Sequence, residues 1–204
     1  PSQRLTLRAA GSTGFRAPSL PQMHYNTTFT DFVAGQPVDK IIASNNSPIT
    51  RALGIDPLKE EKSGNLSYGF GIKYKSFLLT VDAYSIAIKD RIVLTGAFYS
   101  DDPEIGAELQ ALNVGAAQFF TNAVNTTTNG VDIVLGYTPL VTAKQTMRVS
   151  MAANFNKMKI DEINTNDKLK GKESTYFGLR EQYFLLASAP KSKMSFNIDY
   201  TVGK

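Results

Sequence analysis

Hydrophobic and polar residues alternate with a period of two along several stretches of this chain. From Asn65 to Tyr74 the even positions carry large apolar or aromatic side chains, and the odd positions carry Gly, Asn, Ser or Lys. Gln145–Asn156 and Lys193–Gly203 show the same two-sided pattern. Because successive side chains of a β-strand point to opposite faces, the pattern predicts strands with one apolar and one polar face.

Three further segments extend this series of strands. Arg4–Arg16 and Gly130–Tyr137 alternate in the same way. Phe77–Leu94 also alternates, but its apolar positions are odd in the first half and even from Ile86 onward. An extra residue in a β-bulge produces such a slip, so a bulge is predicted near Ser85.

The connections between the strands are alternately short and long. Lys75–Ser76 and Thr138–Leu140 leave room only for tight turns, whereas Ser19–Lys59, Gly96–Gln118 and Lys157–Lys191 are long. Up-and-down antiparallel strands would place all long loops at one rim, which is typical of outer-membrane barrels and uncommon in compact soluble domains. We therefore predict an all-β fold, with antiparallel strands forming part of a large transmembrane β-barrel. A soluble β-sandwich is the alternative.

The second and third long loops are expected to contain helical segments. Asp102 can cap a helix, and Pro103 suits its first position. Gly115 would end this helix, whose apolar stripe consists of Ile105, Leu109 and Leu112. Tyr176–Ala187 is predicted to be helical or an irregular packed segment.

Composition narrows the possible classes of protein. Of the 204 residues, 42% are hydrophobic and 20% charged, which is ordinary for a folded protein. No apolar run approaches the roughly 18 residues of a spanning helix, so strands would have to cross any membrane. The absence of cysteine excludes disulfides. The net charge of +4 is mild, and acidic residues interrupt the lysines of Lys157–Lys172, which favours solvated loops over a nucleic-acid surface.

Residues that could carry catalysis are scarce. His24 is the only histidine, and its neighbours supply no acidic partner for a catalytic triad. The sequence contains no Walker loop and no GxGxxG motif. Acidic residues cluster at Asp101–Glu104 and Asp161–Asp167, but without the spacing of an EF-hand. We therefore predict no enzymatic activity, no metal site and no cofactor.

Charged residues recur on the polar side of the predicted strands. They are Arg4, Arg8, Arg16, Lys73, Asp82, Asp132 and Arg148. Burying such charges without partners would cost several kcal/mol each. This face must therefore be wet or internally paired, as the lining of a large barrel would be.

Several segments, in order along nearly the whole chain, carry a family resemblance. They are Gly14–Gln22, Leu58–Ser63, Val81–Tyr84 with Ile88–Ile92, Thr121–Ala123 with Thr128–Asp132, and Ala189–Lys193. In these segments the chain resembles TonB-dependent outer-membrane receptors, particularly those of Bacteroidetes-type bacteria. The resemblance implies a barrel of about 22 strands around an N-terminal plug. Residues 1–204 would be an internal part of that barrel domain, without the plug or the closing strands.

Such a receptor would lie in the bacterial outer membrane and take up a scarce, bulky nutrient. The resemblance implies a ferric siderophore, haem, a vitamin or a glycan as the ligand, and a TonB–ExbB–ExbD complex that acts on the plug. Its other partners would be outer-membrane lipid and the plug itself. The alternative is a porin or adhesin barrel that has no plug.

Two groups of residues are expected to face the ligand or the plug. The first group lies where the first strand enters the longest loop and comprises Arg16, Gln22, Met23, His24 and Tyr25. The second group lies on the polar side of the strands and comprises Arg8, Asp82, Asp132 and Arg148.

Overall fold

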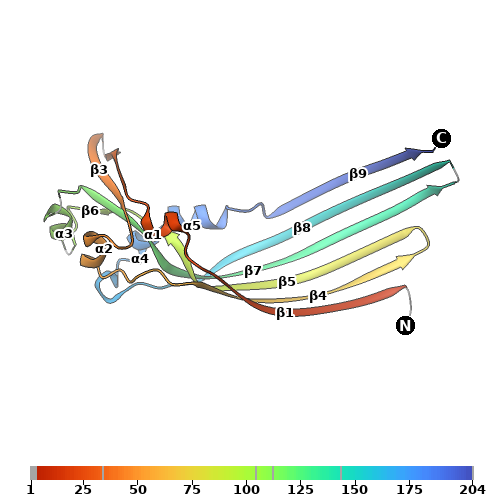
Figure 1. Ribbon diagram of the computed structural model, residues 1–204, viewed down its shortest axis with the longest axis horizontal. Helices are drawn as coiled ribbons and strands as arrows, with labels where there is room; N and C mark the ends of the chain where they lie inside the picture. Colours follow the sequence, from red (N-terminus) through yellow and green to blue (C-terminus); the bar gives the residue numbers. More distant parts are fainter. Residues whose placement is uncertain (1–3, 34, 104, 112, 143, 204) are drawn as a thin grey trace.

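The protein consists of a curved antiparallel wall and, at one end of it, an assembly of loops, short strands and short helices (Figure 1). The structure is a computed structural model that describes residues 4–33, 35–103, 105–111, 113–142 and 144–203. In these ranges no helix has the length and the apolar character needed to cross a membrane.

The wall contains the strands that the alternation predicts. They are β1 (Leu5–Arg16), β4 (Glu61–Tyr74), β5 (Phe77–Leu94), β7 (Ala116–Val141), β8 (Gln145–Ile163) and β9 (Ser192–Val202). Each strand pairs antiparallel with the next one in this order. The tight turns lie at one end, together with the start of β1 and the end of β9, and the long connections lie at the other end (Figure 1). The predicted up-and-down arrangement is confirmed.

The three long connections fold together into what we call the rim assembly. Its elements are α1 (Leu20–His24), β2 (Thr27–Val33), β3 (Gln36–Ala43), α2 (Pro48–Ala52), β6 (Phe98–Tyr99), α3 (Gly106–Ala111), η1 (Asp167–Leu169), α4 (Glu173–Tyr176) and α5 (Leu179–Leu186). The strand β3 pairs in parallel with the first residues of β7, so the assembly is joined to the wall. Leu53, Phe98, Leu109, Phe119 and Phe177 are buried and give it a hydrophobic core of its own.

Helices occur where the sequence predicts them, but with different limits. The helix α3 begins at Gly106, not directly after Asp102. Asp102 still caps the segment that leads into this helix, because its Oδ1 accepts a hydrogen bond from the Ile105 amide at 3.3 Å and its carbonyl oxygen accepts one from the Gly106 amide at 2.8 Å. Its carboxylate also binds Lys172 Nζ at 2.8 Å. Leu112 lies outside the described residues. Most of Tyr176–Ala187 forms the helix α5.

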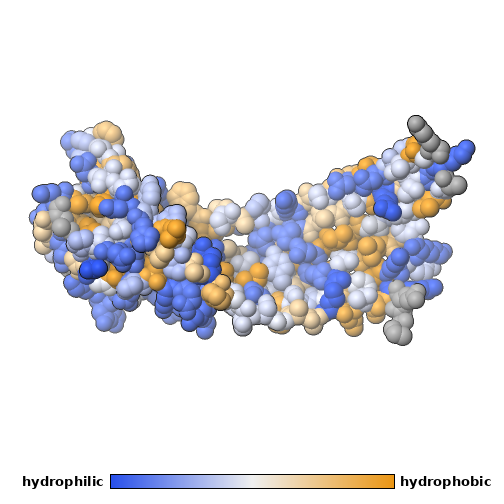
Figure 2. Space-filling view, in the orientation of Figure 1, coloured by the Kyte–Doolittle hydropathy of each residue, from blue (hydrophilic) through white to orange (hydrophobic). Residues whose placement is uncertain are grey.

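One face of the wall is apolar and exposed. The pairing register aligns its side chains into rows, one of which consists of Leu5, Ile72, Leu79, Leu135, Met151 and Phe196. Leu7 is 75% exposed, Met151 39% and Ile198 56%. Figure 2 views one side of the wall, on which apolar residues lie interspersed with polar ones toward the tight-turn end. A soluble sandwich would bury this face, whereas a barrel wall presents it to hydrocarbon. We call it the outer face.

An aromatic row borders the outer face at the tight-turn end. Tyr74, Phe77 and Tyr137 are neighbours in the pairing register. The rings of Phe77 and Tyr137 stack with centroids 4.2 Å apart. Such a row matches the aromatic girdle that barrels place at the membrane interface.

The predicted tight turn at Thr138–Leu140 is wrong. The strand β7 continues to Val141, and its pairing with β8 is irregular around Pro139. Proline has no amide hydrogen to donate to the ladder. The hydrogen-bonded pairing of β7 with β8 is therefore broken locally at Pro139 and resumes at Leu140. The turn follows β7, where the Thr142 amide donates to the Gln145 carbonyl oxygen at 2.8 Å.

The predicted bulge near Ser85 is also wrong. Pairing of β5 with β7 is continuous from Phe77 to Ile88, and the register shifts only afterwards, around Arg91. Asp90 has a φ of 55° at this later irregularity. The change in apolar phase at Ser85 therefore needs a cause other than an inserted residue.

That cause is an exchange of polarity between the two faces of the wall. Toward the tight turns the outer face is apolar, but beyond the row that contains Ser85 it carries Lys62, Lys89 and Lys159. The opposite, inner face becomes apolar at the same level, with Ile88 and Ile160, and the latter packs against the core of the rim assembly. The exchange marks the edge of the band that contacts lipid.

Arginine at position 133 should reveal which face contacts hydrocarbon. Ile133 lies in the middle of the apolar band on the outer face, so Ile133→Arg should lower the free energy of unfolding by about 2–4 kcal/mol. Val134→Arg is the matched control, because Val134 is the next residue, faces inward and is 39% exposed. Urea titration of the intact protein in lipid vesicles measures both. Equal costs would contradict this assignment of the faces.

Candidate functional site

The inner face of the wall carries a row of paired charges. Arg8 on β1 and Asp82 on β5 are separated by β4, yet Arg8 Nε and Nη2 donate to Asp82 Oδ1 at 3.1 and 2.9 Å, and Nη2 also donates to Oδ2 at 2.7 Å. Gly69 is the β4 residue between them in register. A Cβ atom at Gly69 would collide with the Asp82 carboxylate. The glycine therefore makes the ion pair possible.

Asp132 lies directly opposite Asp82 in the register and extends this row. Its Oδ1 accepts a hydrogen bond from Asn154 Nδ2 at 2.7 Å, and the same amide donates to the Tyr84 hydroxyl at 3.1 Å. Gly130 leaves the space that the Tyr84 ring occupies. Two carboxylates on neighbouring strands repel each other, so each is held by its own donor. We call this set of polar residues the inner row.

Arg148 lies apart from the inner row. It is exposed near the tight-turn end of β8, where it is opposite Asp199 in register. The structure thus brings together Arg8, Asp82 and Asp132, but not Arg148.

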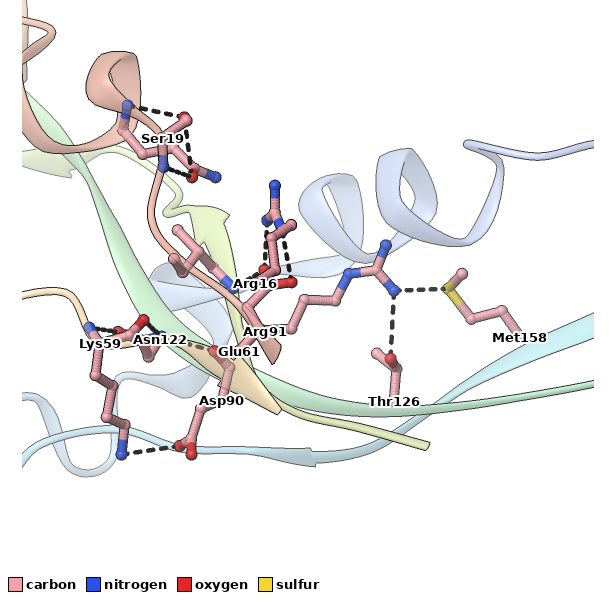
Figure 3. Close-up of polar contacts among 11 residues, drawn as sticks. Arg16, Ser19, Lys59, Glu61, Asp90, Arg91, Asn122, Thr126 and Met158 are labelled. Atoms are coloured by element: carbon pink, nitrogen blue, oxygen red, sulfur yellow. Dashed lines mark hydrogen bonds and ion pairs between the residues drawn. The ribbon is translucent and has the colours of Figure 1, made fainter. Parts of the chain in front are cut away.

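Arg16 ends β1 at the rim with an ion pair to Glu61 (Figure 3). Its Nε and Nη2 donate to the carboxylate at 2.9 and 2.6 Å, and Glu61 Oε1 also accepts from the Ile92 amide at 2.8 Å. Both side chains lie beyond the apolar band. Burial raises the pKa of Glu61, but the hydrogen bonds from Arg16 and Ile92 outweigh it and bring the pKa below its usual value. Arg16 therefore fastens β1, β4 and β5 together.

The helix α1 carries the other residues predicted at the start of the longest loop. Ser19 and Gln22 form a capping box, in which Gln22 Oε1 accepts from the Ser19 amide at 3.0 Å and Ser19 Oγ accepts from the Gln22 amide at 3.4 Å. Gln22 is thus committed to the start of the helix. Met23 is half-buried, whereas His24 and Tyr25 are exposed at the end of α1.

A second polar network holds the irregular part of β5 in place (Figure 3). Asn122 Oδ1 accepts from the Lys59 amide at 2.9 Å, and Asn122 Nδ2 donates to the carbonyl oxygens of Lys59 and Asp90 at 3.0 and 2.6 Å. Lys59 Nζ also binds the Asp90 carboxylate at 3.0 Å. Arg91 donates to Thr126 Oγ1 at 3.3 Å. The sequence does not predict this network, because its members lie in separate segments.

A pocket of about 450 Å³ opens between β2, β3, the rim ends of β5 and β7, and α5. Its walls include Phe29, Phe177 and Phe184. Lys40, which is buried, binds Asp31 at 3.4 Å, and the Arg180 guanidinium lies 5.6 Å from the Phe184 ring centroid. We call it the rim pocket. Its size is that of a small-molecule site, and the sequence does not predict it, because its walls come from separate loops.

The inner row and the rim pocket are suited to binding a solute or a protein surface. Across the residues that the structure describes, His, Cys, Asp and Glu form no group of three or more that could hold a metal ion. The Arg8 and Asp82 side chains are 44% and 35% exposed. A half-exposed row of this kind can guide a polar solute or contact a protein surface.

A protein-family model identifies the type of wall. Residues 1–204 match the family model described as TonB dependent receptor-like, beta-barrel. Among curated proteins, none matches the chain. Among solved structures, the chain is similar to the RagAB peptide importer in the closed-closed state, with 17% identity and a TM-score of 0.49 over 81% of this chain and 17% of that chain.

Two other solved structures are similar to a comparable extent. The copper transporter OprC shows 15% identity and a TM-score of 0.46 over 79% of this chain and 19% of that chain. The siderophore receptor PirA from Pseudomonas aeruginosa shows 12% identity and a TM-score of 0.48 over 79% of this chain and 29% of that chain. The chain thus spans less than a third of each of these proteins.

Removal of the Glu61 carboxylate should loosen the rim end of the wall. Glu61→Ala should lower the free energy of unfolding by about 1–3 kcal/mol, because the buried Ile92 amide and Arg16 both lose their acceptor. Glu60→Ala is the control, since Glu60 pairs with the exposed Lys62 at 3.2 Å, and such surface pairs contribute about 0–1 kcal/mol.

The charge of Glu61 should also give its contribution a pH dependence. The pKa of Glu61 in the folded protein is lowered from 4.5, so its charge stabilises the fold above that pH, and the effect is lost as the pH falls through the folded-state pKa. The stability difference between the parent and Glu61→Gln should therefore shrink on acidification. Unfolding titrations at several pH values measure it, and a difference that grows toward acid pH would contradict the assignment.

Proposed function

Because the chain belongs to the TonB-dependent receptor-like β-barrel family, we propose that it forms part of the wall of an outer-membrane transporter for a scarce, bulky nutrient. The cargo would be a ferric siderophore, haem, a vitamin or a glycan. Energy would come from a TonB–ExbB–ExbD complex that acts on a plug inside the barrel. These residues would form the passage and a binding wall, and would catalyse no reaction.

The observation that carries this proposal is the division of the wall into two chemically different faces. The outer face presents exposed apolar side chains, as a surface in lipid does. The inner row presents ion-paired and hydrogen-bonded polar groups instead. A wall with these faces separates hydrocarbon from a polar interior. That interior can hold a plug and pass a polar cargo.

We further propose that the chain is an internal part of a longer barrel domain. In the described residues β1 pairs only with β4, and β9 pairs only with β8, so each has an edge available for another strand. Open edges of long strands are unfavourable in lipid, because their backbone groups lack hydrogen-bond partners there. Further barrel strands would pair with both edges.

Within this proposal, contact with cargo or plug belongs to three places. The inner row with Asp82 and Asp132 faces the passage. His24 and Tyr25 project from α1 at the mouth. The rim pocket supplies an aromatic surface that carries both basic and acidic side chains, among them Arg180 and Glu181. Arg16 and Gln22 shape the start of the longest loop. Arg16 does so through its ion pair with Glu61, and Gln22 does so through the capping box of α1.

Uptake through the intact receptor should require an active TonB complex. A strain that lacks the receptor, complemented with the intact gene, can be grown on single defined iron or glycan sources. Growth on the cargo should return only when both the receptor and the TonB complex are present. Growth that needs the receptor but not TonB would instead indicate a porin without a plug.

Replacement of both His24 and Tyr25 by alanine should lower uptake several-fold without changing the amount of folded barrel. The reason is that both side chains are exposed at the mouth. Arg51→Ala on α2 is a control at another exposed position of the rim assembly. Uptake of the cargo found in the growth experiment measures the effect. Uptake equal to that of the parent would remove both residues from the proposed site.

A further inference from the structure

Two charged side chains line the rim pocket, and neither of them forms an ion pair with another residue that the structure describes. They are Arg180 and Glu181, which are consecutive residues of α5. Consecutive side chains of a helix do not face each other, so these two charges do not pair with one another either. Charged groups placed in this way in a pocket can fix the orientation of a ligand.

Arg180 extends toward the β2 side of the pocket. The hydrogen bond from the Phe32 amide, the hydrogen bond from Lys40 and the nearby charge of Arg180 all lower the pKa of the Asp31 carboxylate. Lys40 and Asp31 compensate each other at 3.4 Å, so the positive charge of Arg180 is in excess on this side. A carboxylate suits this place, because it can accept two parallel hydrogen bonds from a guanidinium group.

Glu181 extends toward the end of β5. Its Oε2 lies 3.2 Å from the point that a Cβ atom on Gly178 would occupy, and 3.6 Å from the corresponding point on Gly96, which follows β5. In the sheet order, β7 and β3 lie between β5 and β2. The carboxylate of Glu181 and the guanidinium of Arg180 therefore belong to different sides of the pocket. An ammonium group of a ligand suits the Glu181 side, since it donates charge-assisted hydrogen bonds to a carboxylate.

The rim pocket as a whole carries both signs of charge and an apolar interior. Its charged walls are two basic and two acidic side chains, namely Lys40, Arg180, Asp31 and Glu181. A ligand with a single charge would be attracted on one side and repelled on the other, whereas a ligand with both charges matches both sides. The other walls are mostly apolar and include the rings of Phe29, Phe177 and Phe184, against which an aromatic group can pack. The volume of about 450 Å³ suits a small ligand.

We propose that the rim pocket binds a zwitterion that carries an aromatic side chain. The carboxylate of the ligand accepts hydrogen bonds from Arg180, its ammonium group donates to Glu181, and its ring packs against the aromatic walls. Aromatic amino acids and short aromatic peptides have this chemistry. The inference rests on the proposed function, because the rim pocket is one of the places assigned there to cargo, and it adds the chemical group that this pocket recognises.

Isothermal titration calorimetry of the full-length receptor in a neutral detergent tests the proposal. The probes are phenylalanine and the dipeptide Phe-Phe. Each is also used with its ammonium group acetylated, and with its carboxylate converted to an amide. At least one unblocked probe should bind, and blocking either of its charged groups should weaken binding about tenfold, as expected for the loss of one hydrogen-bonded charge. The tighter of the two unblocked probes shows whether a free amino acid or a peptide is the source of this chemistry.

Two substitutions connect each charge of the pocket with its partner on the ligand. Arg180→Gln should weaken binding of the unblocked probe about tenfold and leave binding of the amide unchanged, because the amide has no carboxylate. Glu181→Gln should weaken binding of the unblocked probe to a similar extent and leave binding of the acetylated probe unchanged. Arg51→Gln on α2 and Glu108→Gln on α3 are the matched controls and should bind as the parent does.

Three results would overturn the proposal, and each is separate from a failure of the proposed function. They are no binding of either unblocked probe, equal binding of blocked and unblocked probes, and unchanged binding by both pocket variants. The titration requires no TonB complex, so any of these results would leave TonB-dependent growth as a sign of transport. Conversely, growth that does not need TonB would contradict the proposed transport, while binding of the zwitterion would stand.

Discussion

The structure depends on one constraint, which is that hydrocarbon cannot hydrogen-bond to a polypeptide backbone. Each amide and carbonyl group within the lipid band must find its partner in a neighbouring strand. The antiparallel ladder from β1 to β9 meets this requirement between its two edges, apart from short irregularities such as those around Arg91 and Pro139. Because the ladder fixes the register, it also aligns side chains into rows of one chemical kind. The apolar outer rows and the paired inner row are both consequences of the ladder.

The same strands continue past the lipid band toward the rim assembly, and the surroundings of their two faces change along their length. Beyond the row of Ser85 the outer face meets water and head groups, whereas the inner face meets the rim assembly. The polarity of each face therefore reverses within a single uninterrupted strand. Polar clamps at this level, such as Arg16 with Glu61 and Asn122 with Asp90, tie the loops to the wall where hydrophobic contact with lipid no longer orders the chain.

The sequence predicts the strands well because alternation is local and repeats over many residues. The sequence wrongly predicts a bulge at Ser85, because the alternation of side chains reflects what each face contacts. Where the surroundings of the two faces are exchanged, the apolar positions change parity, just as they do when a residue is inserted in a bulge. Arg8 and Asp82 are 74 positions apart in the sequence, and their ion pair needs Gly69 between them in the strand register. No local sequence pattern therefore predicts this ion pair. The capping role of Gln22 is different, since the Ser-x-x-Gln signal is present in the sequence.

One face of the wall touches lipid, and the other faces a watery interior. The chain has no cysteine, so single cysteines can be introduced at Ile133 and Val134 in a cysteine-free background of the intact receptor. Each is labelled with a fluorophore and exposed in turn to a lipid-attached quencher and a water-soluble quencher. The label at 133 should be quenched from the lipid, and the label at 134 should be quenched from water. The reverse pattern, or equal quenching of both labels, would contradict it.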